Sequence, residues 1–461
     1  MNQWQEFYSQ IKGHDWPDCP DEKEFDQLPG WIKDECIKKH NYKPGQYLKK
    51  QKLQDKIFPI NSSTACKLKW NWSSVFLTTG TTASCHRTTQ HTFNTDEFDF
   101  HNTESKINDR MKMLKGEWPD SGCEYCIAIE KAGGQSDRLT NLKLNGLDYP
   151  PELDVDSNSV RVTPRILEVY FDNTCNLKCL YCTPYYSSLW DAENIKFGDQ
   201  AFVKDKNLQA NKLKIFEYLK NNSKHLTVFN FLGGEPLFQQ EFIECLDLFE
   251  KYPAPNLKLQ IFSNLNIKRD RLEFIIEKIN KLIEQNCLLE FEITASLDCW
   301  GQPQEYVRYP LKLLEWEKNF IFLLEKPWIN LIIGSTITPL TIKTFPDLLE
   351  KINNWSKVRK VYHYQNSVNW PSHQFINIFG NIFEEDFKKA LSLKPENTPE
   401  EIISKNYLQG IAKESGSILP NVQKIVELYN FLNLMDSRRN TNWKKTFPWL
   451  VQEFSKYNLN A

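Results

Sequence analysis

Six apolar, β-rich runs alternate with stretches of helical pattern between residues 166 and 365, and this alternation limits the fold more than any other feature. The runs are ILEVYF (166–171), LTVFNFL (226–232), KLQIFS (258–263), LEFEITASLD (289–298), NLIIGSTIT (330–338) and VRKVYHYQ (358–365). Between them lie stretches of helical spacing such as RDRLEFIIEKINKLIEQN. Alternating strands and helices predict an α/β fold with a parallel sheet. Six such units in about 200 residues suit a partial (β/α)6 TIM-like barrel.

Three cysteines, Cys175, Cys179 and Cys182, stand in the short stretch CNLKCLYC just after the first run. Structural zinc sites close a tetrahedron with four Cys or His ligands, yet the next His or Cys is His225 downstream and Cys126 upstream. A three-thiolate iron–sulfur site leaves one iron open to a small molecule, and open metal positions are typical of sites that perform chemistry. The C-x3-C-x2-C spacing therefore favours a [4Fe–4S] cluster over structural zinc.

Composition agrees with metal-bound thiols and argues against several other classes. The chain has 461 residues, 12 cysteines and a formal net charge of -2, a length that allows about three structural units. Its start, MNQWQEFYSQ, lacks the pattern of a signal peptide, and no window is apolar for long enough to predict a membrane span. Clustered cysteines without an export signal predict reduced thiols in a cytoplasmic protein. The intermixed Lys and Glu residues argue against a dedicated nucleic-acid surface.

With Tyr181 before the third cysteine, the loop reads C-x3-C-x-aromatic-C and resembles the signature of radical S-adenosylmethionine enzymes. The resemblance implies that Cys175, Cys179 and Cys182 hold a [4Fe–4S] cluster whose open iron binds the amino and carboxylate groups of S-adenosylmethionine. It also implies reduction by an electron donor such as flavodoxin or ferredoxin. The reduced cluster then cleaves S-adenosylmethionine to a 5′-deoxyadenosyl radical, which abstracts a hydrogen atom from the substrate.

The turn GGEP, residues 233–236, follows the second predicted strand. Its glycines let a backbone pass close to a ligand or adopt positive φ, and Glu235 offers an acceptor for an ammonium group. The resemblance places Glu235 at the methionine amino group. Other polar residues stand at predicted strand ends, where barrel sites form, although their types also suit turns and helix N-caps. The expected cofactor contacts are Tyr181, Gly233, Gly234, Glu235, Asn264 and Asp298, with Ser263, Ser296 and Arg308 as further candidates.

A second cysteine set precedes the predicted barrel. Cys66 and Cys85 form C-x13-G-x4-C, with Gly80 as the glycine, and Cys123 and Cys126 form C-x2-C. The first pattern resembles half of the auxiliary-cluster motif of twitch and SPASM domains, which follow the barrel in better-known members. Four thiolates suit a second [4Fe–4S] cluster, and the spacing alone fits zinc equally well. We expect the auxiliary cluster, because the radical-enzyme motif lies downstream.

The chain is thus predicted to contain four parts: an extension of unassigned fold (1–60), a twitch-like domain (61–160), the partial barrel (161–370) and a helical extension (371–461). The predicted function is a radical enzyme that acts on a peptide or protein side chain or on a small alcohol. The alternative is a non-catalytic iron–sulfur or zinc protein for electron transfer or protein interaction. Six barrel units and the GGEP turn count against that alternative, since a scaffold needs neither.

Overall fold

The structure is a computed structural model that describes residues 62–85, 88–120, 122–131, 136–139, 160–416 and 419–459. The N-terminal extension predicted for residues 1–60 lies outside these ranges. The chain divides into two compact units. The first unit consists of Met1–Trp70 and Ile107–Val162, and the second of Asn71–Lys106 and Thr163–Ala461.

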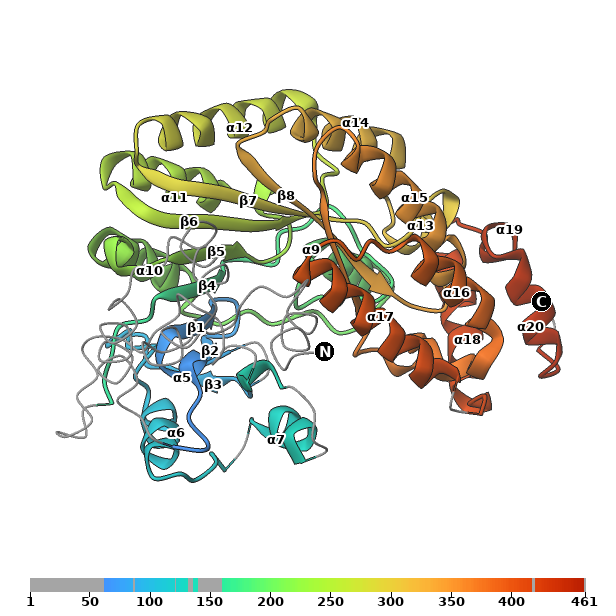
Figure 1. The fold of residues 1–461 in the computed structure, drawn as a ribbon, viewed down its shortest axis with the longest axis horizontal. Coiled ribbons are helices and arrows are strands. Elements are labelled where there is room, and N and C mark those ends of the chain that lie inside the picture. The colour runs from blue at the N-terminus through green and yellow to red at the C-terminus, as the bar shows by residue number, and fades with distance from the viewer. Residues whose placement is uncertain are drawn as a thin grey trace, which may run out of the picture. The chain divides into compact units, whose positions relative to one another are not determined.

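The second unit is built on one sheet with the strand order β3-β2-β1-β4-β5-β6-β7-β8-β9 in its described residues (Figure 1). All six predicted strands are present and pair in parallel with their sequence neighbours. They are β4 (Ile166–Tyr170), β5 (Val228–Leu232), β6 (Ala254–Ser263), β7 (Leu288–Ser296), β8 (Ile329–Ile337) and β9 (Tyr362–Ser367). Within the described residues, the strands at the two ends of this order, β3 and β9, do not pair with each other, so the sheet is open and the predicted partial barrel is confirmed.

A further parallel strand, β1 (Trp72–Phe76), extends the sheet beyond β4. It continues through a turn at Gly80, whose φ is 64°, into the antiparallel strands β2 (Thr81–Ala83) and β3 (His91–Thr92). The sequence placed these residues in the auxiliary domain 61–160, whereas the structure groups residues 71–106 with the barrel. The physical reason is the pairing of β1 with β4 and the burial of Val75 in the barrel core.

Amphipathic helices cover the outer face of the sheet, because their apolar residues recur at helical spacing. In α12, for example, Leu272, Ile275, Ile276, Ile279 and Leu282 are buried. Figure 1 shows α11, α12, α14 and α15 following one another along this face. The helices of the barrel region are α9 (Ser188–Lys196), α10 (Leu208–Asn222), α11 (Gln240–Lys251), α12 (Arg269–Glu284), α13 (Gln302–Val307), α14 (Leu313–Leu324) and α15 (Phe345–Ser356), with short 3-10 turns η1 (Ser223–His225), η2 (Pro236–Phe238) and η3 (Ile342–Thr344).

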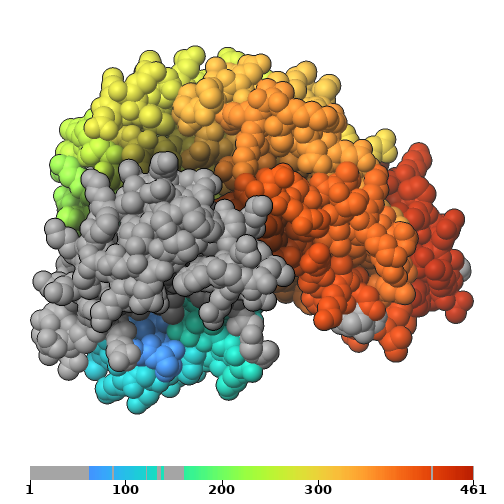
Figure 2. All heavy atoms as spheres, in the orientation of Figure 1, coloured from blue at the N-terminus to red at the C-terminus, as the bar shows by residue number. Residues whose placement is uncertain are grey.

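The chain beyond β9 is helical, as predicted. Figure 2 shows these orange-red to red segments gathered beside the orange residues of α15. One of them, α17, lies against β9, where the Gln365 side chain donates a 2.7 Å hydrogen bond to the Ser404 carbonyl. The elements are η4 (Ser372–Gln374), η5 (Ile376–Phe383), α16 (Glu384–Leu393), α17 (Pro399–Gly416), α18 (Val422–Arg439), α19 (Trp443–Thr446) and α20 (Pro448–Ser455).

The first unit carries most of α5 (Lys67–Asn71), most of α6 (Glu104–Leu114) and all of α7 (Glu124–Lys131). Buried cations tie its segments together. Arg110 is fully buried and donates from Nε to the Lys69 carbonyl and from Nη1 to the Val160 carbonyl, both at 2.8 Å. None of the helices in the described part of the chain combines the length and the apolar character that crossing a bilayer requires.

Candidate functional site

The three cysteines of CNLKCLYC lie in the loop that follows β4 and line one cavity of about 520 Å³. Neighbouring backbone holds this loop in place. Lys178 N–H donates to the Tyr309 carbonyl and Leu180 N–H to the Val307 carbonyl, each at 2.8 Å. The Trp190 indole donates at 2.7 Å to the carbonyl of Cys179. These bonds fix the loop conformation, so the thiols are presented by a supported backbone.

The C-terminal helices also support the cysteine loop. The amide of Gln374, in η4, donates at 3.0 Å to the Leu180 carbonyl. Arg439, the last residue of α18, forms a buried ion pair with Glu193 of α9 at 2.8 Å. Glu193 in turn accepts from Lys178 of the loop, also at 2.8 Å. The helical extension therefore contributes to the site by bracing the loop.

The three thiols are poor acids in their present surroundings. Burial raises the pKa of Cys179, and burial together with the nearby Cys179 raises the pKa of Cys182 to about 12. Burial and the same neighbour also raise the pKa of Cys175 well above its ordinary value. Thiols of this kind ionise when a positively charged metal group supplies the missing counter-charge. Three such thiols on one cavity wall fit a metal cluster as their partner.

Within the residues that the structure describes, no three His, Cys, Asp or Glu side chains surround a position for a single metal ion. All ten cysteines in the described ranges are free thiols, as the composition predicted. Of the remaining cysteines, Cys19 and Cys36 lie outside the described residues.

The GGEP turn packs directly on the backbone that leads into the cysteine loop. A Cβ atom on Gly233, whose φ is 128°, would lie 2.3 Å from the Asp172 carbonyl oxygen. A Cβ atom on Gly234 would lie 2.3 Å from the carbonyl oxygen of Thr174. The turn also donates backbone hydrogen bonds to both carbonyls, from Gly234 at 2.9 Å and from Glu235 at 2.8 Å. Both glycines are required because two backbones meet here.

Glu235 lies on the cavity wall, with almost no exposure to solvent. Its carboxylate accepts from the Ser263 hydroxyl and from the Asn264 backbone N–H, both at 2.7 Å. Burial raises the pKa of Glu235 to about 7, although these hydrogen bonds act in the opposite direction. An ammonium group in the cavity would favour the ionised form, so the carboxylate suits a cationic amine.

Arg308 contributes the only arginine on this cavity wall in the described structure. Behind it, Asp298 is fully buried, and its carboxylate accepts hydrogen bonds from three residues. These are two bonds from Arg308 at 2.7 and 2.8 Å, one from the Tyr181 hydroxyl at 2.6 Å and one from the Thr336 N–H at 2.9 Å. The guanidinium is thereby held in one orientation beside the cysteines.

The cavity brings together most of the candidates from the sequence. Tyr181, Gly233, Gly234, Glu235, Asn264, Ser296 and Arg308 line it with the three cysteines. Asn264 also points its amide at Cys175, with Nδ2 3.9 Å from Sγ. Ser263 and Asp298 are not on the wall: they lie behind it, hydrogen-bonded to Glu235 and Arg308.

Sequence reasoning missed the polar residues on the inner face of the sheet. Glu168 on β4 and Tyr364 and Asn366 on β9 line the same cavity. Glu168 accepts from the Ser74 hydroxyl at 2.6 Å and from the Asn230 amide at 3.0 Å. Alternate residues of a strand share a face, so the polar positions of Glu168 and Tyr364 inside the predicted strands were the available signal, whereas Asn366 lies just beyond the predicted strand.

The auxiliary cysteines divide between the two units. Cys66, Cys123 and Cys126 belong to the first unit and Cys85 to the second. In the first unit, burial lowers the pKa of Arg138, but Glu130 together with the charges of Cys66 and Cys126 raises it overall. Arg138 therefore lies near two of these cysteines.

No protein-family model matches the chain. Among curated proteins, it is similar to the cysteine-type anaerobic sulfatase-maturating enzyme of Clostridium perfringens (strain 13 / Type A), with 26% identity over 234 residues. The corresponding enzyme of strain ATCC 13124 is 27% identical over the same length. The matches cover 48% of this chain and 54% of each relative, so the chain spans about half the length of the curated relatives it matches.

Solved structures of SuiB from Streptococcus suis are also similar in part. The complex with S-adenosylmethionine covers 65% of this chain and 63% of its own, with 12% identity. The complex with the precursor peptide SuiA covers 81% and 70%, with 10% identity. The TM-score is 0.33 in both cases, and a likeness of this size carries no argument.

The second unit thus places three cysteines beside the GGEP turn in an open parallel barrel. These features and the partial similarity to the sulfatase-maturating relatives agree with the resemblance to radical S-adenosylmethionine enzymes that the sequence predicts.

Proposed function

We propose that this chain is a radical S-adenosylmethionine enzyme of the peptide-modifying type. When bound, a [4Fe–4S] cluster and S-adenosylmethionine would supply a 5′-deoxyadenosyl radical for hydrogen abstraction. The observation that supports this most strongly is the shared wall of Cys175, Cys179 and Cys182 with Glu235 and Arg308. It combines three thiols suited to a metal cluster with an acidic and a basic side chain beside them in a single cavity.

Two of the charged groups on the cavity wall match the two charges of an amino acid. Glu235 offers a carboxylate for an ammonium group, and Arg308 offers a guanidinium for a carboxylate. We assign Asp298 and Tyr181 as residues that position Arg308. The Asp298 carboxylate accepts hydrogen bonds from the Tyr181 hydroxyl and from the Arg308 guanidinium. Asn264 would hold its position beside Cys175 and hydrogen-bond to the cofactor.

The inner face of the sheet would receive the substrate. Trp72, Tyr170, Leu232 and Phe262 supply apolar and aromatic wall, which excludes water from a reactive radical. Glu168, Tyr364 and Asn366 supply polar groups for a substrate. The sulfatase-maturating relatives act on a protein, as their name states, and this favours a peptide or protein side chain over a small alcohol.

The four upstream cysteines would hold the auxiliary [4Fe–4S] cluster. Support comes from the first unit, where Cys66 and Cys126 both lie near enough to Arg138 to raise its pKa and Cys123 lies one turn before Cys126. Its role would be electron transfer or substrate positioning, with flavodoxin or ferredoxin as the external donor.

Electron paramagnetic resonance of the anaerobically reconstituted, dithionite-reduced protein tests this function. We expect a [4Fe–4S] signal that changes when S-adenosylmethionine is added. Cys179→Ala should lose this S-adenosylmethionine-responsive signal, whereas Cys245→Ala, at a buried thiol of α11, should keep it. Bound zinc in place of iron, or a signal that S-adenosylmethionine leaves unchanged, would contradict the proposal.

A further inference from the structure

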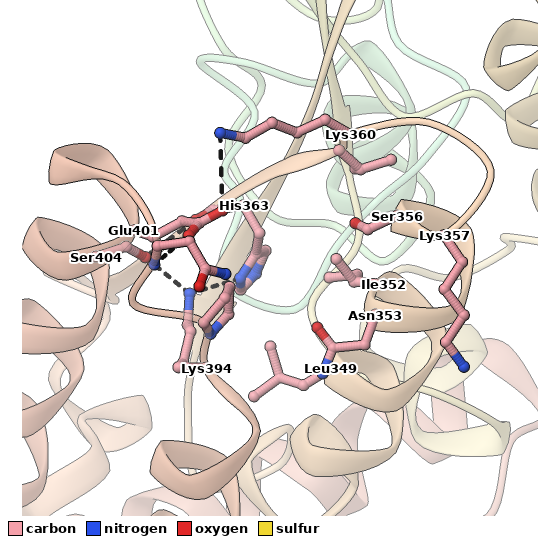
Figure 3. A pocket seen from close by; sticks show the side chains of 13 residues that line it. Leu349, Ile352, Asn353, Ser356, Lys357, Lys360, His363, Lys394, Glu401 and Ser404 are labelled. Carbon is pink, nitrogen blue, oxygen red and sulfur yellow. Dashed lines mark hydrogen bonds and ion pairs between the residues drawn. The ribbon is translucent and has the colours of Figure 1, made fainter.

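A second cavity of about 440 Å³ lies on the helix side of β9, and it shares no lining residue with the cysteine cavity (Figure 3). α15, the residues before β9 and the start of α17 form its walls. Successive residues of a strand point to opposite faces, so Tyr364 faces the barrel interior while His363 faces this cavity. Its volume falls within the range of about 300–1,000 Å³ that is typical of small-molecule sites.

Lys394 is a buried lysine on the wall of this cavity, only 5% exposed. Its amino group contacts His363 Nδ1 and the Ser404 hydroxyl, both at 2.7 Å, and Figure 3 shows the nitrogen between these partners. Both partners are uncharged groups. Among the residues that the structure describes, no carboxylate forms an ion pair with Lys394.

The hydrogen bonds around His363 show why this histidine cannot serve as the counter-charge. The Ser335 hydroxyl has one hydrogen, which it donates to the Leu297 carbonyl at 2.5 Å, so its oxygen accepts from His363 Nε2 at 2.9 Å. Nδ1 is then left without a proton and accepts from Lys394. Burial, with a contribution from Lys394, lowers the pKa of His363 well below its ordinary value. The histidine is therefore neutral.

The charges on the cavity wall leave an excess of positive groups. The titratable residues that line it are Lys357, Lys360, His363, Lys394 and Glu401. Glu401 is already engaged, since it accepts from the Asn397 backbone N–H at 2.8 Å and lies 3.9 Å from Lys360. A buried ammonium group without a counter-charge is costly, and an anion in the cavity would remove that cost.

We propose that this cavity is a binding site for a small molecule bearing an oxyanion, either a carboxylate or a phosphate-like group, which pairs with Lys394. The protonated amino group of Lys394 has three N–H groups, and beyond its contacts with His363 and Ser404 no partner for the third is present in the described structure. Lys360 at the same cavity adds attraction, and the apolar side chains of Leu349 and Ile352 supply surface for the rest of the ligand. The site is independent of the proposed radical chemistry.

Anion binding at this position is coupled to the uptake of a proton. Burial lowers the pKa of Lys394 to about 7, with Glu401 opposing the effect. A bound anion favours the charged amine and so raises that pKa. Binding at about pH 8 should therefore take up close to one proton, and binding at about pH 6 should take up almost none.

Isothermal titration with sulfate and with acetate tests the proposal, since neither probe titrates between about pH 6 and pH 9. Sulfate stands for a phosphate-like group and acetate for a carboxylate, so their relative affinities distinguish the two. Heats measured in buffers of different ionisation enthalpy give the number of protons taken up. We expect saturable binding of at least one probe, weakening as the pH rises above about 7, with proton uptake at pH 8.

Lys394→Met should weaken binding at least about tenfold and abolish the proton uptake. Lys357→Met is the matched control, because this lysine lies at the rim of the same cavity, away from Lys394, and among the described residues its amino group bonds only to the Asn354 side chain, at 2.8 Å. The control should change the affinity by less than about threefold and keep the proton uptake. Absence of saturable binding to the wild-type protein, or binding without proton uptake at pH 8, would overturn the proposal whether or not Lys394→Met folds.

Discussion

Arg308 and Asp298 form a buried two-point ion pair at the edge of the cysteine cavity. Nε donates to Oδ2 at 2.7 Å and Nη2 donates to Oδ1 at 2.8 Å. Because the Tyr181 hydroxyl donates to the same carboxylate, the pair joins the end of β7 to the cysteine loop. A planar guanidinium held at two points presents its remaining surface in a fixed direction. The ion pair explains how the Arg308 guanidinium is held in a fixed position on the cavity wall that carries the three cysteines.

Arg308→Met should destabilise the fold by about 3–5 kcal/mol, because it leaves the Asp298 carboxylate buried without its cation. The double variant Arg308→Met/Asp298→Asn should recover a large part of that loss. Urea denaturation of the single and double variants measures both effects. Lys318→Met, at an exposed pair with Glu315, is the control and should cost less than about 1 kcal/mol. A loss below about 1 kcal/mol for Arg308→Met would refute the structural role given to this pair.

Gly234→Ala should damage the site through the backbone. Its added Cβ would lie 2.3 Å from the Thr174 carbonyl oxygen, so the cysteine loop or the GGEP turn must move. We expect a loss of about 1–3 kcal/mol in the free energy of unfolding and less iron retained per chain after reconstitution. Gly410→Ala, an exposed helical position with open space around it, should instead be neutral or stabilising. Equal iron content in the two variants would contradict the contact described here.

Lys394 should give the fold a measurable dependence on pH. The unfolded chain binds the lysine proton up to its ordinary pKa of 10.5, whereas the folded chain releases it above about pH 7. The unfolded state therefore binds more protons in this window, and stability rises with pH. Relative to Lys394→Met, the wild-type protein should gain up to about 1.4 kcal/mol per pH unit from pH 7 upward. Thermal or urea unfolding of both proteins in anion-poor buffer measures the slope, and parallel profiles would contradict the prediction.

The six barrel strands could be predicted from the sequence because each is a short β-rich run between helical patterns. The last predicted strand, 358–365, begins before the observed one, because residues 358–361 precede β9, which starts at Tyr362. β1 could not be assigned to the barrel, because its partner β4 lies about 90 residues further along the chain. Pairing over such a separation depends on tertiary packing and leaves no local signal.

The candidate site was predictable where residue spacing carries the chemistry. The three cysteines form one short motif and the GGEP turn forms another, and residues of both motifs line one cavity wall. The role of Asp298 was not accessible in this way. Its position at a strand end resembles that of a ligand contact, and only the structure shows Arg308 between it and the cavity. Burial and partner choice are properties of the packed core, which a single sequence does not display.

The measurement that tests the central claim most directly is the formation of 5′-deoxyadenosine. The anaerobically reconstituted, dithionite-reduced protein would be incubated with S-adenosylmethionine, beside Cys179→Ala and the control Cys245→Ala. We predict 5′-deoxyadenosine from the wild-type protein and from Cys245→Ala, and none from Cys179→Ala. A wild-type protein with a fully assembled, reducible cluster that forms no more 5′-deoxyadenosine than Cys179→Ala would contradict the proposed radical chemistry.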